Sequence, residues 1–222
     1  MKKLCAVILI FTMVGLLPVN SFAASATWDG SESGLWVTGG NWVGDSAPGI
    51  ADGTIVSADV ATFTGAVNNA VTVDDTRNVA GITFDASAGA FTLSGNTLYL
   101  TAAGTIQNHA DIATTQTITS NILLGGDYTF SNIATDNTKL MNFDGTITGF
   151  ADTTQALTLS GGNTGSNTIS GVISDGSGTG VLSITKSGVG TWVLSGVNTY
   201  SGGTTISAGV VSATTSAEAL GT

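Results

Sequence analysis

Residues 181–211, VLSITKSGVGTWVLSGVNTYSGGTTISAGVV, contain three short runs in which apolar residues occupy every second position. A period of two is typical of half-buried β-strands, because successive side chains point to opposite faces. Ser-Gly and Gly-Gly pairs separate the runs and supply the positive φ angles of tight turns. The stretch therefore predicts a unit of three strands and excludes a helix. The residues predicted to share one face are Leu182 and Ile184, then Trp192 and Leu194, then Ile206, Ala208 and Val210.

Part of this unit recurs earlier in the chain, as FTLSGNT at 91–97 and LTLSGGNT at 157–164, against WVLSGVNT at 192–199. With Leu93, Leu159 and Leu194 as anchors, the spacings are 66 and 35 residues, which we interpret as two units and one. Repeats of roughly 20–50 residues indicate a solenoid, in which each unit buries its apolar face only by stacking on a neighbour. An irregular β-sandwich could have similar strand spacing but gives no reason for the repeated motif.

Short strand candidates follow one another from Ala70 onwards, and almost every one ends at Gly, Asn or Asp. No window has a sustained helical spacing, which excludes alternating βαβ units. We predict an all-β chain folded as a right-handed parallel β-helix (β-solenoid). Aliphatic ladders would fill its core, and Asn, Thr and Ser would stack with their counterparts in the next coil. About 150 residues allow roughly four to eight coils.

Residues 1–23 have the features of a signal peptide: Lys2 and Lys3, an apolar segment over residues 4–17, and Ser21-Phe22-Ala23 as the cleavage site. A membrane anchor is the alternative, but it would need about 20 apolar residues. We therefore predict an exported protein.

Residues 24–65 hold three of the four tryptophans, Trp28, Trp36 and Trp42. We interpret this region as an N-terminal Trp-rich cap over one end of the solenoid, and a sugar-stacking platform remains the alternative. Solenoid coils are predicted over 66–179 and the clearest repeat over 180–213. Residues 214–222 would be the start of a further coil or a truncated end, with no capping helix.

Composition restricts the possible functions. The chain has 5 Lys and Arg against 15 Asp and Glu, and without residues 1–23 only Arg77, Lys139 and Lys186 remain basic. Such an acidic surface repels nucleic acid, so we expect no nucleic-acid partner. The single cysteine, Cys5, lies in the predicted signal peptide, which argues against disulfides.

Few residues suggest catalysis or metal binding. His109 is the only histidine, its neighbours do not resemble a nucleophile elbow, and His/Cys metal sites are excluded. We expect no enzyme activity, no cofactor and no metal site, although calcium binding by turn aspartates remains open. Each of these aspartates precedes a glycine, which is typical of turns: Asp29, Asp52, Asp144 and Asp175.

Residues 180–211 resemble the autotransporter-associated β-strand repeat, also called the passenger-associated transport repeat. Trp192 and Ser201 stand where that pattern more commonly has Leu and Thr. The matching residues are Lys186, Gly188, Gly190, Thr191, Leu194, Ser195, Gly196, Asn198, Thr199, Tyr200, Gly202, Gly203, Thr204, Thr205 and Gly209.

This resemblance implies a passenger displayed at the cell surface or outer membrane, or secreted, in a Gram-negative bacterium. The repeat would assist passage of the passenger through the outer membrane. Because one complete repeat is present and no barrel follows it, we expect a fragment of a longer chain that depends on a barrel or other translocation machinery. The expected function is that of an exported structural or adhesive surface module, with an unidentified glycan or protein ligand. The alternative is an extracellular carbohydrate-binding or carbohydrate-active β-helix.

Overall fold

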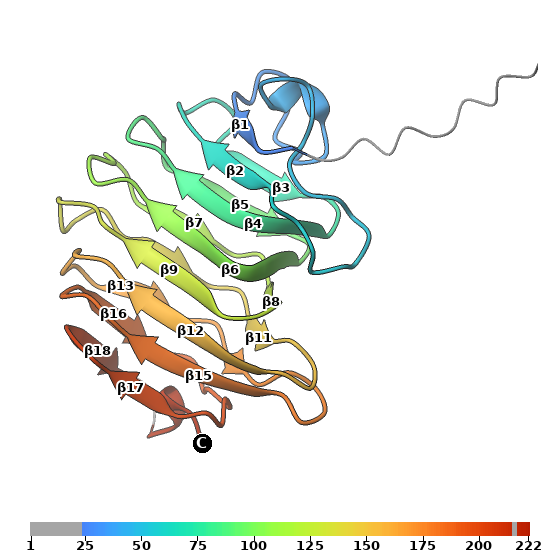
Figure 1. The fold of residues 1–222 in the computed structure, drawn as a ribbon. Helices are drawn as coiled ribbons and strands as arrows, with labels where there is room; N and C mark the ends of the chain where they lie inside the picture. Colours follow the sequence, from blue (N-terminus) through green and yellow to red (C-terminus); the bar gives the residue numbers. More distant parts are fainter. Residues whose placement is uncertain (1–23, 215–216) are drawn as a thin grey trace, which may run out of the picture.

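The computed structural model describes residues 24–214 and 217–222, so the predicted signal peptide lies outside the described residues. The chain is an all-β, parallel β-solenoid of about six turns, which confirms the predicted class of fold (Figure 1). Every pairing between named strands is parallel. Strands from successive coils therefore lie side by side, and the chain advances from one end of the molecule to the other.

Two sheets run the length of the solenoid. The main path of the first sheet is β1 (Ala26–Trp28), β2 (Val60–Phe63), β4 (Arg77–Phe84), β6 (Leu98–Asn108), β9 (Tyr128–Asn132), β12 (Thr154–Ser160), β15 (Val181–Lys186) and β17 (Thr204–Ile206). The second contains β3 (Ala70–Val73), β5 (Thr92–Gly95), β7 (Gln116–Ile118), β10 (Met141–Phe143), β13 (Asn167–Ile169), β16 (Thr191–Leu194) and β18 (Val210–Ala213).

A third, shorter side of each coil leads from the second sheet back to the first. It contains β8 (Ile122–Leu124), β11 (Ile147–Gly149) and β14 (Ile173–Ser174), which pair with one another and with the start of β6. In the early coils, β4 and β6 each form this side and then continue into the first sheet. A register shift between Val79 and Gly81 marks that corner.

The core consists of ladders of inward apolar side chains. In the second sheet, successive partners lie 25 or 26 residues apart and all are fully buried: Leu93, Ile118, Phe143, Ile169 and Leu194. Phe143 also stacks on Phe130 from the first sheet, with 4.1 Å between ring centroids. Burial of such residues stabilises the fold by roughly 25 cal/mol per Å² of apolar surface.

Buried asparagines join the coils at the corner between the two sheets. Asn132 Nδ2 donates to Asn167 Oδ1 over 2.6 Å, and the same oxygen accepts from Met141 N at 3.0 Å. Asn163 Nδ2 donates to the Ala134 carbonyl at 3.1 Å. These bonds link one coil to the next and satisfy Met141 N and the Ala134 carbonyl, which the coil stacking would otherwise leave unpaired.

The unit length inferred from the motif is wrong. Leu93 and Leu194 lie in the second sheet, but Leu159 lies in the first, where it pairs with Phe130 and Lys186. The two outer copies are therefore four coils apart, and the middle copy is out of phase with both. Its Leu-Ser-Gly sequence ends a strand at a different corner of the coil.

The prediction that Ile206, Ala208 and Val210 share the face of one strand is also wrong. A turn over residues 207–209 separates β17 from β18. Ile206 is 52% exposed and Val210 is 51% exposed. These two side chains are exposed because β17 and β18 are edge strands: within the described residues they pair only with β15 and β16.

The segment expected to lack a helix contains a short 3₁₀ helix, η2 (Ala217–Leu220). Ala219 is fully buried, and Thr222 N donates to the Tyr200 carbonyl at 3.1 Å. This segment lies beside the third side of the last coil, because Asn198 and Tyr200 provide hydrogen-bond partners there.

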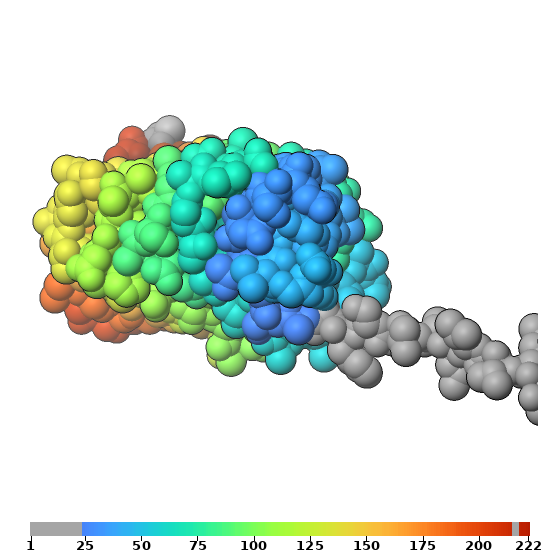
Figure 2. Space-filling view, turned by 90° about the horizontal axis from the view of Figure 1, so that it is seen from above, coloured from blue at the N-terminus to red at the C-terminus, as the bar shows by residue number. Residues whose placement is uncertain are grey.

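An aromatic cluster lies at the other end of the solenoid. Trp28, Trp36 and Trp42 are at most 1% exposed, and each lies 5.0–5.9 Å from Phe63 or another tryptophan of the cluster, measured between ring centroids. The segment that carries these tryptophans also contains the short 3₁₀ helix η1 (Gly39–Asn41). Seen from above, the first residues of the described part, coloured blue, gather over this end of the molecule (Figure 2). The structure thus has the predicted Trp-rich cap. The predicted interval 24–65 also contains β2, which pairs with β4 and so belongs to the first sheet of the solenoid.

Candidate functional site

The C-terminal repeat is centred on Lys186, which is fully buried at the end of β15. It pairs with Leu159, so its methylene groups continue an apolar ladder of the core. Its ammonium donates to the carbonyls of Ser187 at 2.7 Å, Gly188 at 2.8 Å and Ala208 at 3.3 Å. Burial lowers the pKa of Lys186. The lysine therefore ties two successive turns together while its stem packs in the core.

Two glycines make this contact sterically possible. Gly188 has φ +68°, and a Cβ there would lie 2.6 Å from the Gly161 carbonyl oxygen of the preceding coil. Gly209 has φ +72°, and a Cβ would lie 2.4 Å from Gly190 O and 2.7 Å from Lys186 Nζ. Both glycines are required for close approach of successive turns as well as for the left-handed backbone.

Asn198 holds the opposite corner of the repeat and is fully buried. Its Oδ1 accepts from Ile173 N at 2.8 Å, and its Nδ2 donates to Ala219 O at 2.7 Å. One side chain thus bonds to the preceding coil and to η2. The Asn of the Leu-Ser-Gly-x-Asn-Thr motif therefore links its own coil to the preceding coil and to η2 through side-chain hydrogen bonds.

Tyr200 and Asp175 stabilise the segment that leads from the third side of the coil back to the first sheet. Tyr200 is fully buried, and its hydroxyl lies 2.6 Å from the Thr204 hydroxyl. Burial raises the pKa of Tyr200 more than this hydrogen bond lowers it. Asp175 accepts from Leu182 N at 2.6 Å and from Ser201 N at 3.0 Å. Although burial alone would raise it, these hydrogen bonds lower the pKa of Asp175.

The remaining motif residues have architectural positions. Leu194 is a buried core residue, and Thr191 and Ser195 donate backbone hydrogen bonds to the preceding coil. A Cβ at Gly190, Gly196 or Gly202 would lie 2.5–2.6 Å from a carbonyl oxygen of the coil before its own. Thr199 N donates to Ile173 O, Gly203 has φ +73°, and Thr205 pairs with Thr185. The structure therefore brings the predicted set together as one stacked coil.

The structure also shows where the residues considered for catalysis, metal binding and sugar stacking lie. His109 is half-exposed, and its Nδ1 accepts from Asp111 N at 3.1 Å. No group of three or more His, Cys, Asp or Glu within residues 24–214 and 217–222 is arranged to hold a metal ion. The indole faces of Trp28, Trp36 and Trp42 are buried, so these rings offer no surface for sugar stacking in this structure.

Two hollows were missed by sequence reasoning. One, of about 250 Å³, lies on the third side of the solenoid around Tyr99. The other, of about 320 Å³, lies beside Arg77 under the N-terminal cap. Both depend on residues from separate coils or loops, so no local motif marks them.

No helix in the described part of the chain has the length and hydropathy of a membrane span. The fold and the terminal coil define the class: a parallel β-solenoid that carries a passenger-associated transport repeat. The model of the passenger-associated-transport-repeat family matches residues 184–213, the coil described above.

The chain is also similar to the adhesin BmaC autotransporter of Brucella suis biovar 1 (strain 1330), at 33% identity over 124 residues. This match covers 46% of the present chain and 4% of the relative, so the chain corresponds to a small part of that protein. No solved structure matches the chain significantly.

Proposed function

We propose that this chain is a cell-surface passenger module with an adhesin-like role, exported across the outer membrane of a Gram-negative bacterium. Its solenoid would present the outward faces of successive coils, and its C-terminal repeat would promote folding of the passenger during export. A barrel or other outer-membrane translocation machinery would be its partner in a longer chain. The similarity to an autotransporter adhesin supports the location and the class of role.

One observation carries the proposed role of the repeat: its motif side chains are used for contacts between coils. Lys186, Asn198 and Tyr200 are fully buried: Lys186 bonds to two turns, Asn198 to the preceding coil and to η2, and Tyr200 to Thr204 at the start of β17. A coil held in this way keeps its paired strands in register, and each new coil of a solenoid forms on the edge of a folded neighbour. The repeat would therefore act as a stable template for folding outside the cell.

Surface display tests this role. The chain would be fused to an autotransporter barrel, and Lys186→Met or Asn198→Ala would be compared with the unchanged fusion. We expect the variants to reduce the protease-resistant passenger at the surface several-fold while barrel insertion stays the same. Val197→Ser is the matched control, because Val197 belongs to the same coil and is 56% exposed. Undiminished display of both motif variants would refute the proposed role.

A carbohydrate-binding function is the second candidate, and the hollow around Tyr99 favours it. Tyr99, Leu123 and Thr148 are paired residues of three successive coils, so they lie side by side. Thr97, Asn121, Ile122 and Thr146 complete a lining without charged residues. An aromatic ring with nearby amide and hydroxyl groups suits a neutral sugar.

A glycan array separates the two candidates. If the hollow binds sugar, Tyr99→Ala should abolish binding without lowering the melting temperature, and Tyr99→Trp should retain it. Trp36→Ala should instead lower stability, because Trp36 is fully buried in the cap. Sugar binding that survives Tyr99→Ala would remove this hollow from consideration.

A further inference from the structure

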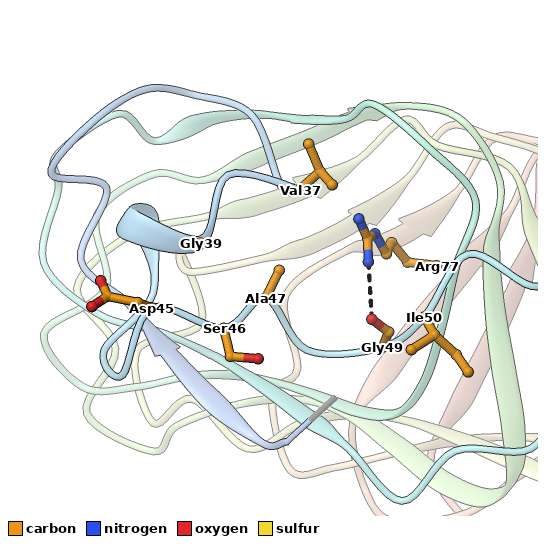
Figure 3. A pocket seen from close by; sticks show the side chains of 8 residues that line it. All are labelled: Val37, Gly39, Asp45, Ser46, Ala47, Gly49, Ile50 and Arg77. Carbon is orange, nitrogen blue, oxygen red and sulfur yellow. Dashed lines mark hydrogen bonds between the residues drawn. The ribbon is translucent and has the colours of Figure 1, made fainter. Parts of the chain in front are cut away.

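A cavity of about 320 Å³ lies where the N-terminal cap meets the first complete coil. Its lining includes Val37, Asp45, Ala47, Gly49, Ile50 and Arg77. Figure 3 shows the Arg77 guanidinium pointing into the space near Val37 and Ala47, with its bond to Gly49 dashed. The cavity is thus built by the loop of the cap on one side and by the start of β4 on the other.

Arg77 is 7% exposed, and most of its hydrogen-bonding capacity is unused. Nη1 donates to the Gly49 carbonyl at 2.9 Å, but the buried Nε has no partner. Among the described residues, no carboxylate forms an ion pair with the guanidinium. Burial lowers the pKa of Arg77, and the charges of Asp74 and Asp75 partly oppose this effect. Arginine nevertheless remains protonated at any physiological pH.

A buried guanidinium without an ion-pair partner is unusual, because removing a charge from water is unfavourable unless the charge is paired. The guanidinium carries five N–H donors in a planar fork, and this fork matches the two oxygens of a carboxylate. Arg77 lines the cavity, so a ligand there can reach the Nη end of the guanidinium, whereas Nε is buried. The unused donors therefore point to an anionic ligand with planar, two-oxygen geometry.

We propose that this cavity binds the carboxylate of a monosaccharide-sized sugar acid, with Arg77 as the group that recognises it. The volume is at the lower end of ligand pockets, which suits one sugar ring. Ser46 also lines the cavity and can hydrogen-bond to a ring hydroxyl, whereas the Asp45 carboxylate points away from Arg77 (Figure 3). Val37, Ala47 and Ile50 supply apolar surface for the carbon face of the ring. This site is separate from the hollow around Tyr99 and does not depend on the proposed surface function.

An NMR titration of the purified protein with D-glucuronate tests the assignment, and D-glucose is the neutral probe of the same size. The measurement should be made near 0.15 M salt, where the Debye length is about 8 Å and repulsion by distant acidic residues is screened. For a ligand of this size we expect a dissociation constant on the order of 1 mM. The largest shifts should fall on residues 37–50 and on the amide of Arg77.

Three variants make the test specific. Arg77→Gln should weaken glucuronate binding about tenfold or more, because it removes the charge-assisted bonds. Lys139→Gln is the matched control: it removes the same charge from another part of the solenoid and should leave binding unchanged. Ala47→Leu keeps Arg77 but fills the cavity, so it should abolish binding while the protein stays folded.

The outcomes are decisive in both directions. Saturable binding of glucuronate, absence of glucose binding and loss of affinity in Arg77→Gln and Ala47→Leu would support the proposal. Equal affinity in Arg77→Gln, or no binding to the unchanged protein, would overturn it. Acetate that binds as tightly as glucuronate, or N-acetylglycine that binds more tightly, would overturn the assignment to a sugar acid.

Discussion

Replacement of Lys186 by methionine isolates the contribution of the buried ammonium. Methionine has a similar unbranched stem, so it can keep the ladder contact with Leu159 while it removes three hydrogen bonds. The substitution leaves the carbonyls of Ser187 and Gly188 without this donor. Any loss of stability should therefore come from the turns and not from the core.

The expected magnitude follows from two opposing terms. Each hydrogen bond to a charged group contributes about 1.5–3 kcal/mol, and the buried ammonium loses several kcal/mol of solvation. Lys186→Met removes the ammonium together with its loss of solvation but leaves buried carbonyls without a donor, which costs about 1–3 kcal/mol, so we expect a net destabilisation of about 2 kcal/mol. Because a solenoid opens locally from its ends, this loss should fall mainly on β17 and β18. It corresponds to roughly 30-fold faster hydrogen exchange there.

Hydrogen exchange read by mass spectrometry or NMR measures this effect. The informative amides are those of Ser207, which donates to Lys186 O, and Val210, which donates to Gly190 O. Lys139→Met is the control, since Lys139 is partly exposed and pairs with Asp136 at 3.7 Å. Unchanged protection of Ser207 and Val210 in Lys186→Met would show that the ammonium does not hold the turns.

Burial also predicts how pH should act on this contact. The pKa of Lys186 is lower in the folded protein than in the unfolded chain, so the unfolded chain binds more protons between the two values. Stability of the wild-type terminal coil should therefore rise relative to Lys186→Met as the pH approaches the unfolded pKa of about 10.4. A relative fall over that interval would contradict the assigned burial effect.

Three further predictions concern other contacts. Gly209→Ala should destabilise the terminal coil by clearly more than Gly203→Ala, as measured by chemical denaturation, because both glycines have positive φ but only Gly203 has free space around a new Cβ. Tyr128→Phe should cost about 1 kcal/mol through loss of its 2.9 Å bond to Ala80 O. Burial raises the pKa of Tyr128 in the folded protein, so the wild type should lose stability above about pH 10 more steeply than this variant in denaturation curves. Trp36→Ala should destabilise the cap by about 3–5 kcal/mol, visible as early loss of the tryptophan fluorescence signal on heating.

The class of fold could be predicted because alternation is a local property of each strand. The position of the repeated motif within each coil could not be predicted. Leu-Ser-Gly ends β12 in the first sheet and β16 in the second, since any strand that meets a tight turn needs an inward apolar residue and then a residue that permits the turn. Gly161 after β12 has φ +102°, and Gly95 at the end of β5 has φ +106°. The same local solution at different corners produced misleading spacings of 66 and 35 residues.

The repeat residues could be predicted as a set, but their individual roles depend on long-range contacts. Asn198 bonds to Ile173 in the preceding coil and to Ala219 in η2, and neither partner is marked by the motif. The cavity at Arg77 was beyond sequence reasoning for a related reason. The irregular segment that contains Gly49 has no periodicity, so nothing in the sequence places its carbonyl beside the start of β4.

The position of Lys186 explains why the repeat carries a lysine. Its partners along the ladder are Leu159 on one side and Ile206 on the other, so the position is an inward, apolar one. A leucine would continue the ladder but could not bond to Ser187, Gly188 and Ala208, whose carbonyls converge on the ammonium. Earlier coils bond to their turn carbonyls with Asn132 and Asn163 instead. The lysine combines both tasks in one side chain, and this combination makes the terminal coil depend on a single residue more than the earlier coils do.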